Sequence, residues 1–360
     1  MKLPYEIAEK TVLAVDVGGT NTSLALMQGA SQKLELLLER SYFTKKESSL
    51  SRLMLSFLAE ARDRGLRKAS SCCISAAGPL EGRTIKLTNA SWILDAGLIE
   101  NETGMPVKLI NDFSAIAWGV LLLDTKNPAE LLQLEDMGGH KPEPDPGAPL
   151  LVLGAGTGLG YGFVLRDGGR PRVYPSEGGH ASLPVYDAET RALSRWLEGR
   201  FSFAAGTEAA VSGPGLSNIY EFLTVGKEPG GAAGAAEKAA KIMQLEEAKR
   251  PEAIALAAEK GDCLCMHAMD IFVRLYARAA ADAATVFLPR GGIYLAGGIA
   301  AKNAHWFTEK RRFMESFTKG YREHVRAIAK ATPIFIVRDY SISLYGDAFA
   351  ALMEPERSKF

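Results

Sequence analysis

The stretch TVLAVDVGGTNTSLALM, residues 11–27, decides how the chain begins to fold. An apolar and β-branched run at residues 11–15 ends at Asp16 and passes through the glycine-rich residues 18–21. An apolar run resumes at residues 23–27. Two such runs on either side of a glycine-rich tip are typical of a β-hairpin. We therefore predict two strands joined by a tight turn.

A second stretch of the same form occurs much later in the chain. An apolar run at residues 150–153 leads into GAGTGLG at residues 154–160 and continues as an apolar run at residues 161–165. The repetition of strand, glycine-rich turn and strand indicates that the two halves of the chain are distant duplicates.

Strand patterns alternate with helical patterns in the rest of the chain. The sequence predicts further strands at residues 34–43, 69–75, 107–110, 293–296 and 333–337, and helices at 50–64, 113–123 and 343–353, with 232–250 and 252–288 mostly helical. Residues 138–147, GGHKPEPDPG, are the clearest loop. The alternation predicts the α/β class.

The composition excludes several classes of protein. The 42 Lys and Arg residues balance 42 Asp and Glu residues, whereas proteins that bind nucleic acid by charge have a basic excess. No apolar run reaches the roughly 20 residues of a membrane-spanning helix, and the N-terminus lacks the apolar core of a signal peptide. Four cysteines among 360 residues are too few for a disulfide framework. We expect a cytoplasmic protein of two domains that binds neither nucleic acid nor a membrane.

Both glycine-rich turns suit a phosphate group. Backbone N–H groups at such a turn form an anion site, and glycine lets a phosphate approach without interference from a Cβ atom. Thr20 and Thr157 add hydroxyl donors, and Asp16 could hold Mg²⁺ directly or through water. The chain lacks the GxxxxGKS/T motif of a P-loop, and a strand follows residues 154–160 where a Rossmann site needs a helix. The alternative is a pair of tight hairpins without a ligand.

Four polar residues are candidates for the chemistry of a site. Asp112 follows a buried strand and precedes a helix, where α/β folds present functional residues. There it could accept a proton during phosphoryl transfer, or it could simply cap the helix. Glu177, His180 and Glu208 suit the recognition of a polyol, since carboxylates accept hydrogen bonds from hydroxyl groups. Each of these three could instead be an ordinary polar surface or turn residue.

Six motifs along the chain resemble, in order, those of the bacterial-type glucokinases. These belong to the superfamily that contains actin, hexokinase and the heat-shock chaperones. DVGGTN at 16–21 resembles the first phosphate motif, LINDF at 109–113 the catalytic-base motif, LGAGTGLG at 153–160 the second phosphate motif, EGGH at 177–180 the sugar-binding turn, Glu208 with SGPGL at 212–216 the next element, and LAGGI at 295–299 the adenosine motif. Thr88, Asn89 and Trp92 fit the same family.

The resemblance implies a fold and a reaction. The fold is the two-domain, α/β, actin-like ATPase fold, which is ribonuclease H-like, with the active site in the interdomain cleft. We expect a small domain at residues 1–122, completed by a C-terminal helix within 341–360, and a large domain at 123–340. The reaction is the ATP-dependent phosphorylation of D-glucose at its 6-hydroxyl group, which gives glucose 6-phosphate and ADP.

The resemblance also implies roles for individual residues. Asp112 would be the general base that takes the proton from the 6-hydroxyl group. The residues expected to bind the sugar are Asn89, Asn111, Asp112, Glu177, His180 and Glu208. The residues expected to bind ATP with Mg²⁺ are Asp16, Gly18, Gly19, Thr20, Asn21, Gly156, Thr157 and Gly158 at the phosphates and Gly297 and Gly298 at the adenosine. Asp16 would be the residue that holds Mg²⁺, directly or through water.

The chain departs from its relatives at one position, and other functions stay open. Ser23 stands where many relatives carry Arg or another long polar residue, which puts a charge contact beside the first phosphate turn in doubt. After His180 no cysteine occurs before Cys263, which argues against the zinc-binding ROK sugar kinases. The alternatives are a kinase for fructose, mannose or N-acetylglucosamine, a sugar sensor without catalysis, and an actin-like ATPase with a protein partner. The phosphate donor and the oligomeric state, with a homodimer as one possibility, stay open.

Overall fold

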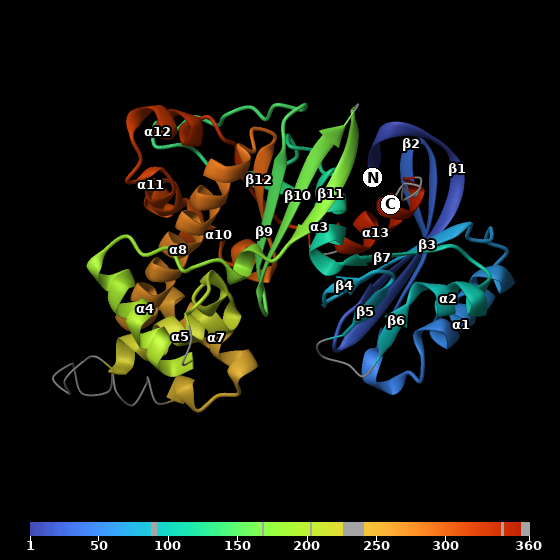
Figure 1. The fold of residues 1–360 in the computed structure, drawn as a ribbon, viewed down its shortest axis with the longest axis horizontal. Coiled ribbons are helices and arrows are strands. Elements are labelled where there is room, and N and C mark those ends of the chain that lie inside the picture. The colour runs from blue at the N-terminus through green and yellow to red at the C-terminus, as the bar shows by residue number, and fades with distance from the viewer. Residues whose placement is uncertain (88–91, 168, 202–203, 226–240, 340–341, 354–360) are drawn as a thin grey trace. The chain divides into compact units, whose positions relative to one another are not determined.

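The computed structural model describes residues 1–87, 92–167, 169–201, 204–225, 241–339 and 342–353. The chain forms two compact units, which we describe separately (Figure 1). The first unit comprises residues 1–130 and 339–360, and the second comprises residues 131–338. The C-terminal segment therefore returns to the unit that the N-terminal segment begins.

The first unit contains a four-stranded sheet in the order β2-β1-β3-β7. Its strands are β1 (Lys2–Val17), β2 (Asn21–Phe43), β3 (Ser71–Ala76) and β7 (Val107–Asn111). β1 pairs antiparallel with β2 and parallel with β3, and β3 pairs parallel with β7. The predicted hairpin is confirmed, because Val15 faces Leu24 and Asp16 faces Ser23 across the β1–β2 ladder.

The strand predicted at residues 34–43 is confirmed, and it forms the second half of β2, whose backbone is extended from Asn21 to Phe43. The polar residues between the two apolar runs look like a turn in the sequence. In the structure β1 extends toward the N-terminus and pairs with them, so that Ile7 faces Ser31. The second half of β2 folds back beside the first, because Ser23 donates to the hydroxyl of Ser41 at 3.3 Å and Ser31 between them has a positive φ of 52°.

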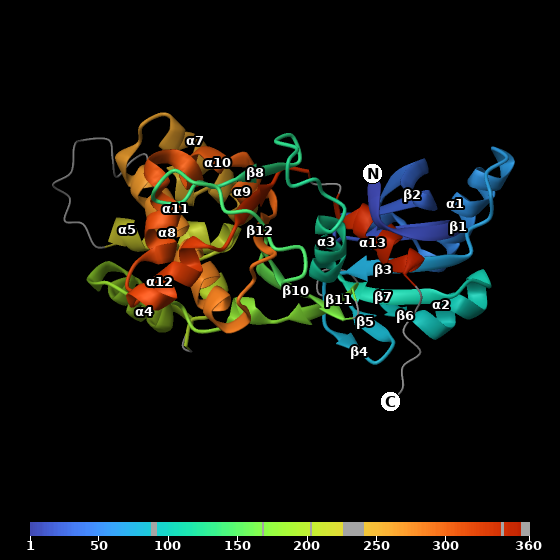
Figure 2. The same ribbon diagram turned by 90° about the horizontal axis from the view of Figure 1, so that it is seen from above.

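Helices and a small second sheet complete the first unit. They are α1 (Leu50–Asp63), α2 (Ala96–Thr103), α3 (Asp112–Val120), α13 (Ile342–Leu352) and the short 3₁₀ helix η1 (Thr44–Lys46), with strands β4 (Leu80–Glu81), β5 (Thr84–Lys86) and β6 (Ile93–Asp95) in the small sheet. The predicted helices at 50–64, 113–123 and 343–353 are confirmed. α13 packs on β1, β3 and α3, and Figure 2 shows α3 and α13 side by side.

The second unit contains a six-stranded sheet in the order β11-β10-β9-β12-β13-β8. Its strands are β8 (Leu131–Gln133), β9 (Leu150–Ala155), β10 (Leu159–Asp167), β11 (Arg170–Ser176), β12 (Gly292–Ala296) and β13 (Ile334–Val337). β9 pairs antiparallel with β10 and parallel with β12, and β12 pairs parallel with β13. This repeats the order and directions of β2, β1, β3 and β7, in agreement with the predicted duplication.

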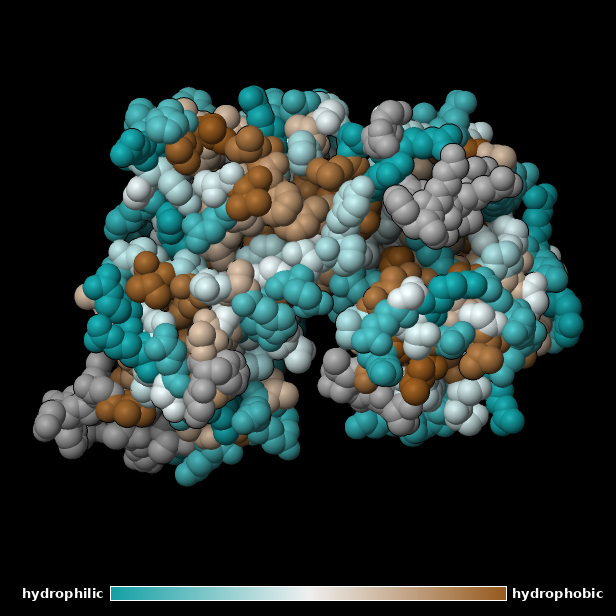
Figure 3. All heavy atoms as spheres, viewed as in Figure 1, coloured by the Kyte–Doolittle hydropathy of each residue, from teal (hydrophilic) through white to brown (hydrophobic). Residues whose placement is uncertain are grey.

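Helices complete the second unit. They are α4 (Ala188–Phe201), α5 (Gly213–Val225), α7 (Arg250–Glu259), α8 (Cys263–Phe287), α9 (Gly298–Lys302), α10 (Ala304–Thr308), α11 (Arg312–Thr318) and α12 (Glu323–Lys330), with the 3₁₀ helices η2 (Gly178–His180), η3 (Thr207–Ala209), η4 (Glu247–Lys249) and η5 (Glu309–Arg311). No helix in the described part of the chain is both long and apolar enough to cross a membrane. On the face seen in Figure 3, hydrophobic residues of this unit gather near β12 among mostly hydrophilic neighbours.

A side chain of helix α8 forms hydrogen bonds with the backbone at the end of β9. Tyr276 of α8 is fully buried, and its hydroxyl group donates to the carbonyl oxygen of Leu153 at 3.1 Å. The hydroxyl oxygen of Tyr276 in turn accepts from the backbone N–H of Ala155 at 3.3 Å. These bonds fix the last residues of β9, from which the second glycine-rich turn departs.

Candidate active site

The first glycine-rich turn is held in one conformation by its own backbone and by Thr44. The N–H of Gly18 donates to the carbonyl oxygen of Asn21 at 2.9 Å, and a Cβ atom on Gly18 would lie 2.8 Å from that oxygen. The Thr44 hydroxyl donates to the carbonyl oxygen of Gly18 at 2.8 Å, and its N–H donates to that of Thr20 at 2.9 Å. A rigid turn that only glycine can form is what a phosphate cradle requires. Sequence reasoning missed Thr44, which no motif singles out.

Asp16 lies at the end of β1, just before this turn. Its Oδ2 atom accepts a hydrogen bond from the Ser343 hydroxyl at 2.8 Å. Burial raises the pKa of Asp16, the hydrogen bond from Ser343 opposes the rise, and the charge of Asp112 adds to it. A bound cation would favour the ionised form. A carboxylate beside a phosphate cradle is a donor set that fits Mg²⁺, which takes one or two carboxylates together with water and substrate phosphates.

Asn111 and Asp112 lie where β7 passes into α3. The side-chain oxygen of Asn111 accepts from the N–H of Ser114 at 2.7 Å, so Asn111 is the N-cap of α3. Asp112 is therefore not the cap of this helix, because its neighbour Asn111 is. Asp112 is the first residue of the helix, and its Oδ1 accepts from the N–H of Phe113 at 2.9 Å. The positive end of the helix dipole favours an ionised carboxylate at this position.

The cap also limits what Asn111 can offer a ligand. Its side-chain oxygen is engaged with Ser114, which leaves the amide nitrogen as the group that could bind a sugar hydroxyl.

Two other residues singled out in the sequence lie elsewhere. Ser23, which stands where many related sequences carry a longer polar residue, donates to the hydroxyl of Ser41 at 3.3 Å within β2. Asn89, another predicted sugar residue, lies outside the described residues.

The second glycine-rich turn joins β9 and β10 in the second unit. The N–H of Gly156 donates to the carbonyl oxygen of Gly158 at 2.8 Å, and the N–H of Gly213 donates to that of Gly156 at 2.7 Å. Glu208 accepts a hydrogen bond from the N–H of Leu159 at 2.7 Å through Oε2. A Cβ atom on Gly158 would lie 2.5 Å from the same carboxylate oxygen. The turn is thus fixed by a residue that the sequence assigned to sugar binding.

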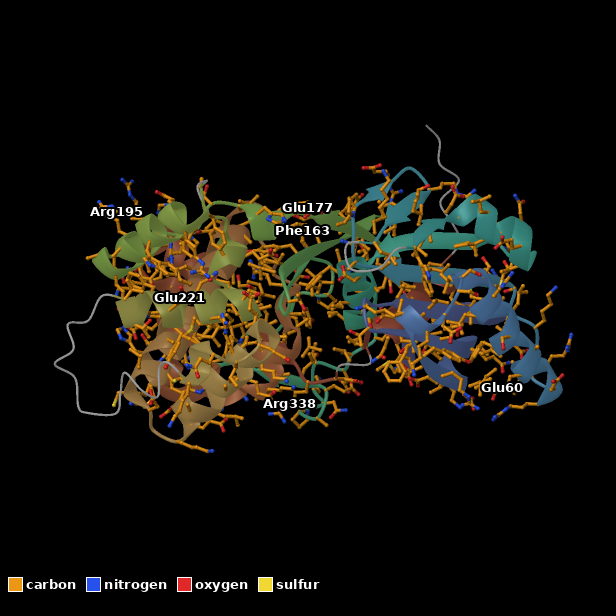
Figure 4. The ribbon with its side chains drawn as sticks, turned by 90° about the horizontal axis from the view of Figure 1, so that it is seen from below. Glu60, Phe163, Glu177, Arg195, Glu221 and Arg338 are labelled. Carbon is orange, nitrogen blue, oxygen red and sulfur yellow. The ribbon has the colours of Figure 1, made fainter. Side chains whose placement is uncertain are left out.

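Glu177 precedes the short helix η2, and His180 is the last residue of this helix, next to the same turn. A Cβ atom on Gly179 would lie 2.0 Å from the carbonyl oxygen of Leu159, so only glycine lets η2 pack here. The side chains of Glu177 and His180 are 78% and 68% exposed, with 3.7 Å between Oε2 and Nε2. Glu177, which is labelled in Figure 4, directly follows the last residue of β11. These two side chains are exposed, and η2 packs against η3, the short helix that carries Glu208.

Gly297 places the last predicted motif beside the second turn. It has a φ of 87°, and a Cβ atom on it would lie 2.7 Å from the carbonyl oxygen of Ala155. Gly298 begins α9 directly afterwards. The second unit therefore brings the second glycine-rich turn, η2, Glu208 and Gly297 together around the end of β9. The first unit brings together Asp16, the first turn, Asn111 and Asp112.

The chain is similar to known proteins over nearly its whole length. The Glucokinase family model matches residues 13–354 of this chain. The glucokinases of Nostoc punctiforme and of Nostoc sp. are 34% and 35% identical to it over 353 residues, which cover 94% of this chain and 98% of each relative.

Solved structures share the fold. A glucokinase from an Antarctic psychrotroph has a TM-score of 0.76 at 22% identity and covers 95% of this chain and 98% of its own. A ROK family glucokinase from Streptomyces griseus in complex with glucose and AMPPNP has a TM-score of 0.59 at 19% identity. The match covers 95% of this chain and 99% of the Streptomyces griseus protein. These likenesses confirm the predicted actin-like ATPase fold.

Proposed function

This chain belongs to the glucokinase family, and we therefore propose that it transfers the γ-phosphoryl group of ATP to the 6-hydroxyl group of D-glucose. The relatives that cover nearly its whole length are glucokinases, and the similar structure from Streptomyces griseus contains glucose and AMPPNP. The observation that carries the proposal is a phosphate-type glycine turn in each unit, together with a carboxylate, Asp112, at the start of a helix in the first unit.

In this proposal Asp112 is the general base. Phosphoryl transfer to an alcohol needs a carboxylate that accepts the hydroxyl proton as the oxygen attacks phosphorus. Asp112 is held by the N–H of Phe113 and by the helix end, both of which favour the ionised form that can accept the proton. Asn111 supports the same geometry, because its cap fixes the first turn of α3.

Four of the described polar residues would recognise the sugar in this proposal. Glu177, His180 and Glu208 of the second unit would accept from and donate to the ring hydroxyl groups, with Asn111 donating through its amide nitrogen. Asn89 keeps the same assignment from its motif. A site that pairs each hydroxyl group discriminates against sugars that lack one by about 10⁴–10⁵-fold.

The two glycine-rich turns would hold the ATP phosphates, and Gly297 and Gly298 would let the backbone approach the adenosine. The same cradles are formed by Gly18, Gly19, Thr20 and Asn21 in the first unit and by Gly156, Thr157 and Gly158 in the second. Asp16 would hold Mg²⁺, directly or through water. When bound, Mg²⁺ neutralises charge that develops on the transferred phosphoryl group.

The sugar dependence of ATP turnover tests the proposed function. ADP release is measured with Mg-ATP alone and with glucose, fructose, mannose or N-acetylglucosamine. We expect release that depends on glucose and exceeds that with the other hexoses. Release with another hexose alone would overturn the substrate, and release that ignores every sugar would overturn the kinase function and favour a protein-partnered ATPase.

A further inference from the structure

The C-terminal helix α13 is packed tightly between the elements that carry Asp16 and Asp112. A Cβ atom on Gly346 of α13 would lie 1.8 Å from the carbonyl oxygen of Ala115 on α3. Gly119 of α3 has equally little room, since its Cβ atom would lie 2.3 Å from the carbonyl oxygen of Ile342. The two helices therefore touch through their backbones, and α13 also packs on β1, the strand that ends with Asp16 and Val17. Neither helix can shift without disturbing the other.

Two polar side chains of α13 connect this helix to the sheet. Ser343 and Asp347 are four residues apart and so lie on one face of the helix. Ser343 donates to Asp16 at 2.8 Å, and Asp347 accepts from the Ser75 hydroxyl at 2.8 Å and from the Cys73 thiol at 3.8 Å. Ser75 faces Asp16 across the parallel β1–β3 ladder. The contacts therefore close a ring that runs from Asp16 through α13 to the neighbouring strand.

This ring is costly for a helix that only covers a sheet. The Asp347 side chain is fully buried, and a buried carboxyl group lowers stability unless its hydrogen bonds compensate. A helix with a purely structural role would be more stable with an apolar residue at this position. The polar face of α13 is therefore better explained by what it holds in place, namely the carboxylate of Asp16.

We propose that α13 is a positioning element of the active site and that Ser343 is the residue that orients Asp16. This inference rests on the proposed function, in which Asp16 holds Mg²⁺. A donor on one oxygen of a ligating carboxylate fixes its direction, and loss of such an outer partner typically costs about 10–100-fold in metal affinity or activity. Asp347 anchors the helix through Ser75, so that Ser343 stays within reach of Asp16.

Three variants separate positioning from simple packing. Ser343→Ala removes the hydroxyl group, Ser343→Thr keeps one, and Phe349→Leu is the matched control. Phe349 is fully buried on the same helix and packs edge-on against Trp118 with 5.4 Å between ring centroids, so its loss weakens α13 without removing the bond to Asp16. Calorimetry gives the Kd of ADP with and without Mg²⁺ and the Kd of glucose, and thermal unfolding gives Tm.

Ser343→Ala should reduce the Mg²⁺-dependent gain in ADP affinity about tenfold and leave the Kd of ADP without Mg²⁺ and the Kd of glucose unchanged. Ser343→Thr should restore most of that gain. Phe349→Leu should lower Tm and keep the gain. If Ser343→Ala keeps the gain, or if Phe349→Leu loses as much of it, the inference is overturned.

Asp16→Asn, measured in parallel, separates this inference from the function on which it rests. If Asp16→Asn keeps the full Mg²⁺-dependent gain in ADP affinity, then the assignment of Mg²⁺ to Asp16 fails, and the inference fails with it. If Asp16→Asn loses the gain while Ser343→Ala keeps it, only the positioning role of Ser343 fails.

Discussion

The carboxylate of Glu208 accepts a hydrogen bond from the N–H of Leu159 at 2.7 Å, so one side chain joins the predicted sugar site to the second phosphate turn. Glu208→Ala should therefore raise KM for both glucose and ATP. Glu208→Gln keeps an oxygen that can accept from Leu159 but loses the charge. It should raise KM for glucose about tenfold or more and leave KM for ATP near its original value, because a hydrogen bond to a charged group contributes about 1.5–3 kcal/mol. Steady-state kinetics with each substrate varied checks this difference, and equal effects of both variants on ATP would contradict it.

Gly297 should tolerate no side chain. Gly297→Ala would place a Cβ atom 2.7 Å from the carbonyl oxygen of Ala155 at a φ of 87°, which strains the backbone beside the second phosphate turn. We expect weaker ATP binding and a loss of stability of about 1–3 kcal/mol.

Gly199 provides the matched control for this glycine. It lies inside α4, and no atom of the described residues comes within 4 Å of a Cβ atom placed there. Gly199→Ala should raise the free energy of unfolding by about 0.5–1 kcal/mol without changing ATP affinity. Urea unfolding and ATP titration of both variants check the pair, and equal ATP affinities would contradict the role of Gly297.

The buried carboxyl group of Asp347 should make stability depend on pH. Burial, together with the charge of Asp16, holds the pKa of Asp347 well above its usual value. The folded state then binds a proton more tightly than the unfolded state, so stability falls as pH rises above the unfolded pKa of about 3.9.

Asp347→Asn removes that dependence, since asparagine resembles the protonated acid. The free energy of unfolding of Asp347→Asn minus that of the unaltered chain should increase as pH rises from 4 toward the raised pKa. Urea unfolding across this pH range measures the difference. A difference that is constant or shrinks with pH would show that Asp347 does not titrate as described.

Arg274 should stabilise the second unit without any role in catalysis. Its guanidinium group pairs with Asp270 at 2.7 Å, with Glu189 at 2.6 Å and with Asp187 at 3.1 Å, and its side chain is only 19% exposed. Arg274→Ala leaves these carboxylates without that charge and should cost about 3 kcal/mol or more.

The exposed Arg62 gives the comparison, because it pairs with Asp63 at 3.7 Å with both side chains largely in solvent. Arg62→Ala should change stability by less than about 1 kcal/mol. Both variants should keep the kcat of the unaltered chain at a temperature where they stay folded. Equal losses of stability would contradict the burial argument.

Local patterns predicted the elements that position the site. The glycine-rich turns, the strand that ends before Asp112 and the final helix all follow from apolar runs and the residues that interrupt them, and the structure confirms them. The pairing of residues 2–10 with the polar middle of β2 did not follow, because the sequence predicts no strand before residue 11.

The partners of the site residues could not be predicted in the same way. Thr44 closes the first turn and Ser343 holds Asp16, yet neither belongs to a motif, and Ser343 reaches its partner only because α13 returns to the first unit. The cap on α3 likewise falls on Asn111 and not on Asp112, a choice that the sequence left open. Contacts between distant segments depend on packing, which periodicity does not encode.

The central claim is that Asp112 is the general base of glucose phosphorylation. Its most direct test is the kcat of Asp112→Asn alongside the calorimetric Kd of glucose, with Asp124→Asn, a loop carboxylate that accepts from the N–H of Lys126, as the control. We predict that Asp112→Asn lowers kcat about 10²–10⁴-fold while glucose still binds, and that Asp124→Asn matches the unaltered chain. A kcat within about threefold of the unaltered chain, with glucose bound, would contradict the claim.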